Sequence, residues 1–166
     1  MKSSVQIRKA RSSDFDSIWV IIKEVIALGD TYVFAPDSDR TSMLDYWCGS
    51  DKHTYVAVIE NEVVGTFIIK DNFPGLGSHV ANASYMTLPG AFGKGIGRSM
   101  AEFSLTEVKR LGYLAMQFNI VVKSNERAIR LWQKLGFEIK GEIPEAFNHL
   151  EKGYTDVYIM WRKLKR

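Results

Sequence analysis

The chain has 166 residues, of which 46% are hydrophobic, and it carries 22 Lys and Arg against 19 Asp and Glu. This size and composition predict a single domain over residues 1–166 with an ordinary core. The formal net charge of +3 is too small, and the basic residues too scattered, to indicate a nucleic-acid partner. No apolar run approaches the roughly 20 residues that cross a bilayer, and the N-terminus has no signal-peptide core, so we expect a cytoplasmic protein without a membrane partner.

The first third of the chain predicts one strand and two helices. Residues 5–9 alternate in the manner of a short strand. Apolar residues then recur at helical spacing up to residue 26, with cap residues at 12–14 before them and Gly29 as the stop. A loop over residues 30–40 leads to a second short helix over 41–47.

The rest of the chain alternates strands with helices. Helices are predicted from Ile96 to near Gly112 and over residues 125–135. Strands are predicted over residues 54–60, 63–70, 80–88, 114–122, 137–143 and 156–162, the first two forming a hairpin at Asn61-Glu62. The resulting order, β-α-α-β-β-β-α-β-α-β-β, indicates an α/β mixture around one sheet.

A glycine-rich segment, Phe92-Gly93-Lys94-Gly95-Ile96-Gly97-Arg98-Ser99, lies between a predicted strand and a predicted helix. Glycines let backbone amides approach an anion, and the free amides and positive dipole of a helix start suit a pyrophosphate. A glycine-rich turn without a ligand explains the segment alone equally well. Its spacing fits neither the nucleotide-hydrolysing phosphate loop nor the dinucleotide fingerprint.

Two motifs resemble those of the GCN5-related N-acetyltransferase superfamily. The acetyl-coenzyme A loop of that family, Gln/Arg-x-x-Gly-x-Gly/Ala, is matched at both glycines, with Phe92 at its first position. The second hallmark, Asn-x-x-Ala-x-x-Leu-Tyr-x-x-x-Gly-Phe, is matched at Asn125, Ala128, Leu131, Gly136 and Phe137, with Trp132 in place of tyrosine. The resemblance implies acetyl-CoA as cofactor, a homodimer, and a mixed, mainly antiparallel twisted sheet flanked by about four helices.

Shorter segments are similar to those of particular enzymes within the superfamily. Residues 31–36 and 153–160 look like the enzymes that acetylate small amino acids and their analogues, such as phosphinothricin-type acetyltransferases. Asn82-Ala83, Phe118-Asn119 and Ser124-Asn125 are similar to fungal acetyltransferases that act on azetidine-2-carboxylate. The resemblance therefore implies an N-acetyltransferase with a small-molecule amine substrate. A protein N-terminus, a polyamine, or a non-catalytic acetyl-CoA-binding module are the alternatives.

Trp132 decides the predicted mechanism. Family members often use the tyrosine at this position as a general acid, whereas an indole has no comparable proton to donate, so Trp132 is interpreted as a packing residue. Catalysis then depends on orientation and on donors for the developing oxyanion. Asn119 and Asn125 are the predicted catalytic residues, and Asn125 also fits a helix N-cap. Apolar alternation at residues 116, 118, 120 and 122 places Asn119 on the other face of its strand.

The remaining site residues are expected contacts of the two substrates. The cofactor-binding set is Met86, Leu88, Phe92, Gly93, Lys94, Gly95, Ile96, Gly97, Arg98, Ser99, Asn125, Ala128 and Trp132. The acceptor-binding set is Phe34, Asn82 and Tyr85. Candidates for a base are Glu62, His79 and Tyr85, each of which is also explained as a structural or exposed residue. The three histidines are isolated in the sequence, so no metal site is expected.

Overall fold

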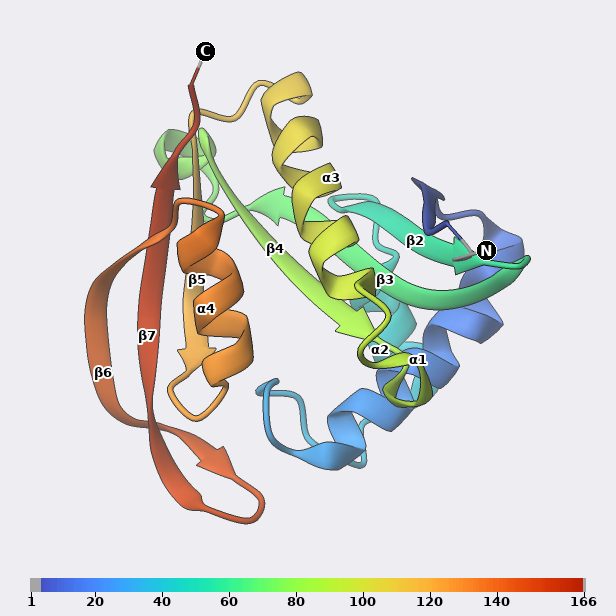
Figure 1. Ribbon diagram of the computed structural model, residues 1–166, viewed down its shortest axis with the longest axis horizontal. Coiled ribbons are helices and arrows are strands. Elements are labelled where there is room, and N and C mark those ends of the chain that lie inside the picture. Colours follow the sequence, from blue (N-terminus) through green and yellow to red (C-terminus); the bar gives the residue numbers. More distant parts are fainter. Residues whose placement is uncertain (1–3, 166) are drawn as a thin grey trace.

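The computed structural model describes residues 4–165, and its strands form one sheet in the order β1-β2-β3-β4-β5-β7-β6 (Figure 1). The β4–β5 pair is parallel, and all other neighbouring strands in the sheet are antiparallel. The strands are β1 (Gln6–Lys9), β2 (His53–Ile59), β3 (Glu62–Asp71), β4 (Val80–Thr87), β5 (Ala115–Val122), β6 (Glu138–His149) and β7 (Gly153–Lys163). The element order and the mainly antiparallel α/β fold predicted from the sequence are confirmed.

Four helices cover the sheet in two layers (Figure 1). α1 (Phe15–Leu28) and α2 (Arg40–Trp47) pack on one face, and α3 (Ile96–Arg110) and α4 (Glu126–Lys134) lie on the other. The central strand β3 is buried on both faces, with Phe67 and Ile69 in the α3 cluster and Ile68 in the α1 cluster. Burial of each such side chain stabilises the fold by about 1.5–3 kcal/mol. The strands that carry the site are therefore held by a well-packed core on both faces.

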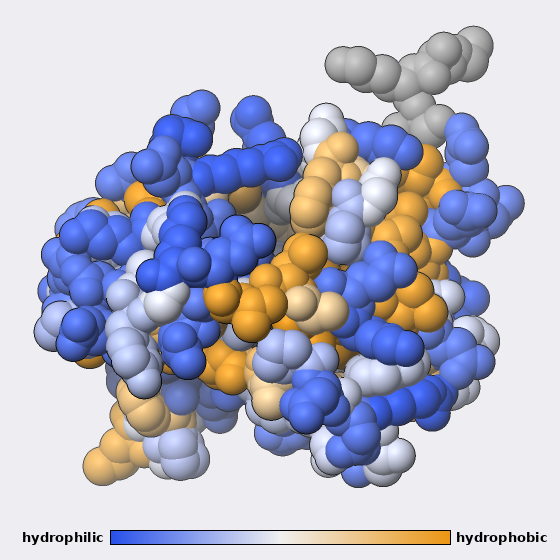
Figure 2. Space-filling view, turned by 90° about the horizontal axis from the view of Figure 1, so that it is seen from below, coloured by the Kyte–Doolittle hydropathy of each residue, from blue (hydrophilic) through white to orange (hydrophobic). Residues whose placement is uncertain are grey.

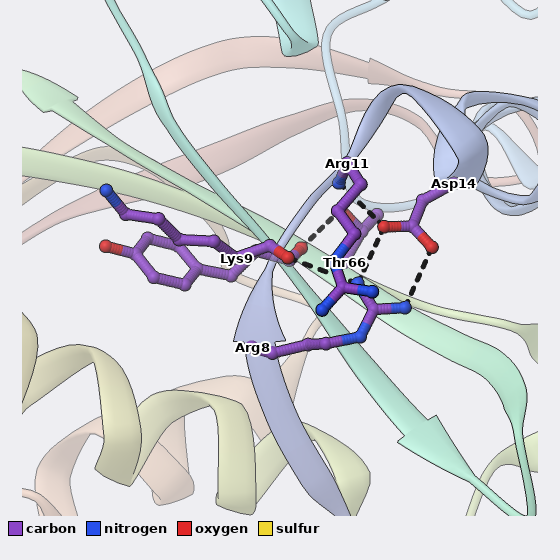
Figure 3. A network of polar contacts seen from close by, with 6 residues as sticks. Arg8, Lys9, Arg11, Asp14 and Thr66 are labelled. Atoms are coloured by element: carbon purple, nitrogen blue, oxygen red, sulfur yellow. Dashed lines mark hydrogen bonds and ion pairs between the residues drawn. The ribbon is translucent and has the colours of Figure 1, made fainter.

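The start of α1 is fixed to the sheet edge by a small ionic network (Figure 3). The Arg8 guanidinium on β1 donates to both Asp14 carboxylate oxygens, at 2.7 and 2.9 Å, and the Arg11 amide donates to the same group at 2.7 Å. The hydrogen bonds from Arg8 lower the pKa of Asp14, which is buried. This network therefore sets where α1 begins, and it lies outside the functional site described below.

Two boundaries differ from the sequence prediction. The β2–β3 turn is centred on Glu60 and Asn61, both at positive φ, rather than on Asn61-Glu62. The β6–β7 hairpin is longer than residues 137–143 and 156–162 predicted, because Pro144 lies on the edge strand, where its missing N–H disrupts little. The extension is held by Phe147, which packs in a small cluster with residues of β5 and β7.

None of the helices formed by residues 4–165 is long and apolar enough to cross a membrane.

Candidate active site

β4 and β5 separate soon after they begin. They pair only at Val80 with Ala115 and at Ala81 with Met116, and their C-terminal ends diverge (Figure 1). A cleft of about 640 Å³ lies between the diverging strands, lined by residues of β4, β5, α4, the loop after α1 and the glycine-rich segment. Apolar surface gathers in the middle of the molecule's lower face, between hydrophilic side chains on either side (Figure 2). The divergence creates a site where backbone and side chains can meet a ligand.

The exposed edge of β4 carries hydrogen-bonding groups that point into this cleft. Leu88 donates its amide to Val64 of β3, so the even-numbered residues of β4 pair with β3. Tyr85 instead directs its backbone into the cleft, where the Tyr32 hydroxyl accepts from the Tyr85 amide at 2.8 Å and donates to the Tyr85 carbonyl. Burial raises the pKa of Tyr32, so its hydroxyl stays protonated. The loop after α1 is thereby fastened to the strand edge.

The glycine-rich segment forms the other end of the cleft. Gly93 and Gly95 have φ of 84° and 75°, where an L side chain is strained, although a Cβ at either position would meet nothing within 4 Å. Gly95 is the N-cap of α3 and offers no side chain to the first-turn amides, which are left for an anion. Arg98 and Arg127 add positive charge to the wall. These residues fit the pyrophosphate and the extended arm of acetyl-CoA.

Most of the expected cofactor-binding residues line the cleft, and three do not. Phe92, Gly93, Gly95, Ile96, Gly97, Arg98, Asn125, Ala128, Trp132 and Met86 belong to the wall. Met86 and Ile96 are almost fully buried, so they form its floor. Leu88, Lys94 and Ser99 are absent from the wall, and Leu88 packs between the two core clusters instead.

Asn125 and Trp132 of the second motif have separate structural roles. Asn125 is the N-cap of α4, its Oδ1 accepting from the Ala128 amide at 3.3 Å, and it also lines the cleft. Trp132 is 8% exposed and packs against Phe118 and Tyr85, with ring centroids 4.4 and 5.0 Å away. Trp132 is therefore the apolar side of the cleft, next to the strand edge, and its ring has no proton of tyrosine-like acidity.

Asn119 lies on the face of β5 opposite Phe118, as alternation predicts, and a bulge follows it. The pairing of β5 with β7 shifts by one residue between Phe118 and Val121. The alternation expected from the sequence therefore fails after Asn119: Ile120 is 40% exposed, whereas Val121 joins Phe118 in the core. The extra residue leaves Ile120 in the cleft wall next to Asn119, and bulges are common beside active sites.

Four side-chain amides meet beside the point where the strands part. The Oδ1 atom of Asn72 accepts from the Nδ2 atoms of Asn82 and Asn119, at 3.1 and 2.8 Å. Asn82 also donates to the Gln117 carbonyl at 3.2 Å, and the Gln117 side chain donates to Asn119 Oδ1 at 2.9 Å. Asn82 and Asn119 line the cleft, whereas their hydrogen-bond partners Asn72 and Gln117 are not part of its wall. Sequence analysis missed Asn72, because no local pattern relates the end of β3 to β5.

An aromatic group formed by Tyr32, Phe34 and Tyr46 also lines the cleft. Phe34 lies between Tyr32 and Tyr46, with ring centroids 6.3 and 5.4 Å away. Lys70 is part of the same wall, and its Nζ lies 5.6 Å from the Tyr46 ring centroid. Of the expected acceptor-binding residues, Phe34, Asn82 and Tyr85 all belong to the wall, and Tyr32, Tyr46 and Lys70 are additions that the structure supplies.

The three candidate bases are not brought together at the cleft. Glu62 lies at the start of β3 and His79 precedes β4, and both are exposed and outside the wall. Tyr85 is in the wall, but its hydroxyl is paired with Ser104 Oγ at 2.6 Å, and burial raises its pKa. Within residues 4–165 no group of three His, Cys, Asp or Glu side chains could hold a metal ion. The cleft is thus walled by neutral amides, aromatic rings and a few charges.

Comparison with known proteins identifies the class that this fold and site define. Residues 19–137 match the family described as Acetyltransferase (GNAT) family, and the chain belongs to it. A GCN5-related N-acetyltransferase from Kribbella flavida has a TM-score of 0.91 and 36% identity, over 96% of this chain and 98% of that one. The resemblance inferred from the two motifs is confirmed, and acetyl-CoA is the co-substrate of this family.

Two further relatives show how far the likeness extends. N-acetyltransferase aca1 of Schizosaccharomyces pombe is 38% identical over 102 residues, which are 60% of this chain and 48% of aca1. The match thus spans about half of that relative's length. A phosphinothricin acetyltransferase from Sinorhizobium meliloti, in complex with acetyl-CoA, has a TM-score of 0.85 at 23% identity, over 99% of this chain and 89% of that one. This second likeness shows a shared fold.

Proposed function

We propose that this protein transfers the acetyl group of acetyl-CoA to the amino group of a small amino acid or amino-acid analogue. The observation that carries the proposal is the convergence of two chemistries in one cleft. Glycine-loop amides and arginines form one end, which we call the donor end. Asn82, Asn119 and Lys70 form the other, which we call the acceptor end. Membership of the GNAT family supports the acetyl transfer, and the residues at the second end of the cleft support the acceptor class.

Each part of the wall has a task in binding the donor. The free amides of the first turn of α3 would hold the pyrophosphate, helped by the charges of Arg98 and Arg127. The open edge of β4 would pair with the amide groups of the extended arm, much as a further strand would. Trp132 and Ala128 supply apolar contact beside it. Acetyl-CoA itself supplies the activated thioester.

The reaction needs a neutral amine close to the thioester carbon. A C–N bond forms, the C–S bond breaks, the amine loses a proton to solvent, and the departing thiolate takes one up. Holding the reactants in line is worth about 7–11 kcal/mol, and Asn119 and Asn125 are the groups proposed to orient them. Donors from the chain to the carbonyl oxygen supply the remaining stabilisation. No ionised side chain is required for these tasks.

The wall favours a small acceptor with a carboxylate. The tip of the β6–β7 hairpin lies against the loop after α1, because the Leu150 amide donates to the Gly29 carbonyl at 2.9 Å, and Leu28 and Asp30 on either side of Gly29 line the wall. A polypeptide acceptor needs a groove that is open there. Lys70 attracts a carboxylate and repels the extra ammonium groups of a polyamine. An amino acid satisfies both conditions.

Turnover with a panel of amines tests the proposal. The purified chain and acetyl-CoA are mixed with azetidine-2-carboxylate, proline, phosphinothricin, spermidine or a short peptide with a free N-terminus, and free thiol is followed. We expect thiol release with the amino acids. Faster release with spermidine or the peptide would assign a different acceptor. Acetyl-CoA binding measured by calorimetry, with no thiol release in any mixture, would indicate a non-catalytic acetyl-CoA-binding module instead.

A further inference from the structure

The amide cluster behind the cleft contains a residue that no motif includes. Asn72 follows β3, lies 47 residues before Asn119 and accepts both of its side-chain hydrogen bonds at one atom, Oδ1. It stays outside the cleft wall, whereas both of its partners, Asn82 and Asn119, belong to it. All three side chains are partly buried. Any effect of Asn72 on a ligand therefore passes through these two partners.

The orientation of the whole cluster follows from one backbone carbonyl. The Gln117 carbonyl can only accept, so the Asn82 atom that lies 3.2 Å from it is the Nδ2 donor. The atom of Asn72 that faces Asn82 Nδ2 must then be an acceptor, Oδ1, and it requires a donor from Asn119 as well. Asn119 is left to accept from Gln117 Nε2 through its own Oδ1. Reversal of any one amide would set two donors or two acceptors against each other.

This orientation decides what Asn82 offers to the cleft. Both of its N–H groups are used, one by Asn72 and one by the Gln117 carbonyl, which leaves Oδ1 as its remaining polar atom. Asn119 keeps one N–H, since its other N–H is donated to Asn72. The acceptor end therefore presents a carbonyl oxygen on one strand and an N–H on the other. Asn82, expected from sequence to bind the acceptor, is set to accept a hydrogen bond rather than to donate one to a carboxylate.

We propose that Asn72 is a positioning residue, which fixes the amides of Asn82 and Asn119 so that Asn82 Oδ1 accepts an N–H of the acceptor amine. The inference rests on the proposed function. An amine held by its N–H directs its lone pair elsewhere, and here the cleft beyond Asn82 leads along the β4 edge to the donor end. Without Asn72, Asn82 keeps one bond and its amide is free to turn, which removes the selection of one orientation.

Variants of Asn72 separate positioning from general support. In Asn72→Ala, we expect the KM for azetidine-2-carboxylate to rise about tenfold, the effect of one hydrogen bond, with the KM for acetyl-CoA within about twofold of wild type. Asn72→Asp should restore most of the acceptor KM, because a carboxylate accepts from both Nδ2 atoms. Asn148→Ala, at an exposed asparagine on β6 outside the cleft, is the matched control. Equal rises in both KM values, or no rescue by Asn72→Asp, would overturn the proposal.

A measurement that needs no turnover keeps this test apart from that of the proposed function. The side-chain amide resonances of Asn82 and Asn119, followed by ¹⁵N–¹H spectroscopy, report the cluster directly. We expect Asn72→Ala to shift both and Asn148→Ala to shift neither. If the wild-type chain acetylates no amino acid, the proposed function fails and these spectra alone decide on Asn72. Unchanged resonances in Asn72→Ala would then overturn its positioning role.

Discussion

The two ends of the cleft are built in opposite ways. The donor end comes from two continuous segments, residues 93–98 and 125–132, and much of it is backbone held by positive-φ glycines and a helix start. The acceptor end is assembled from Tyr32, Asn72, Asn82 and Asn119, joined across up to 53 residues of sequence. Cofactor binding by backbone groups should therefore tolerate most changes of side chain, whereas the acceptor end depends on the identity of a few amide side chains. We expect substitutions at the donor end to weaken acetyl-CoA binding, and substitutions at the acceptor end to lower turnover of the acceptor.

The largest effect is expected from a charge placed in the glycine loop. Gly95→Asp adds a strained side chain and a negative charge where the pyrophosphate is proposed to lie, so acetyl-CoA affinity should fall by at least about 100-fold in calorimetric titration. Gly112→Asp is the matched control, because Gly112 also has a positive φ and open space around it, at the opposite end of α3. Both variants should lose similar stability. Equal acetyl-CoA affinity for the two would remove the loop from the site.

At the acceptor end, Asn119→Ala should lower kcat/KM by about 10²–10³, the usual cost of one donor to a developing oxyanion. Asn125→Ala should combine a similar loss with about 1 kcal/mol of stability, because its side chain also caps α4. Thermal unfolding beside steady-state kinetics separates the two contributions. If a folded Asn125→Ala variant has normal turnover, Asn125 acts only as the N-cap of α4. Normal turnover in both variants would contradict the catalytic assignment of both residues.

A smaller effect is expected where the two ends meet at Trp132. Trp132→Phe keeps an aromatic ring against Phe118 and Tyr85 but leaves a small void, so stability should fall by about 1–3 kcal/mol. Turnover should stay within about tenfold of wild type, because no proton transfer depends on the indole. The check is kcat measured at saturating acetyl-CoA. A loss of several orders of magnitude in a stable variant would give Trp132 a chemical role.

The smallest effect on the site is expected from Glu107, which anchors the C-terminal part of α3, away from the glycine loop. Hydrogen bonds from Arg110, and one from the Tyr55 hydroxyl, lower the pKa of Glu107 from 4.5 to about 2. Its folded-state pKa lies below the unfolded value, so its stabilisation is present above pH 4.5 and is lost as the pH falls toward 2.

Glu107→Gln should therefore be less stable than wild type at neutral pH, by on the order of 1–2 kcal/mol, and the difference should shrink in acid. Urea unfolding at pH 7 and pH 3 gives the comparison, and acetyl-CoA affinity at pH 7 should change little. A stability difference that stays constant between the two pH values would contradict the ionic origin of the contribution.

The sequence was sufficient for the fold and for most of the segments that line the proposed donor end, because both depend on local patterns. Apolar spacing placed the helices, and the spacing of Gly95, Gly97 and Asn125 located the segments that line the donor end. The alternation rule failed in β5, since a bulge between Phe118 and Val121 adds a residue without leaving a mark in composition. Prediction of a bulge needs the partner strand, which sequence periodicity does not include.

The acceptor end shows the same limit from another side. Gln117 lies two positions before Asn119 in an apolar strand, so the alternation that singled out Asn119 could also have singled out Gln117. Asn72 gives no such signal, because its role exists only once β3, β4 and β5 lie side by side. Likewise, the predicted strand over residues 137–143 stops before Pro144, whereas β6, an edge strand, continues past it to His149.

The early parting of β4 and β5 also has a thermodynamic consequence. Beyond Ala81, β4 does not pair with β5, so the part of its edge that Tyr32 does not occupy keeps hydrogen-bonding capacity that a ligand lying along β4 would use. Binding to the folded state alone adds RT ln(1 + [L]/Kd), about 2.7 kcal/mol at a ligand concentration 100 times Kd. For a chain of this size that corresponds to a rise in Tm of roughly 5–10 °C. A higher concentration of acetyl-CoA would then lengthen the lifetime of the protein as well as raise its turnover. The ligand-free form would be the one that unfolds and is degraded more readily.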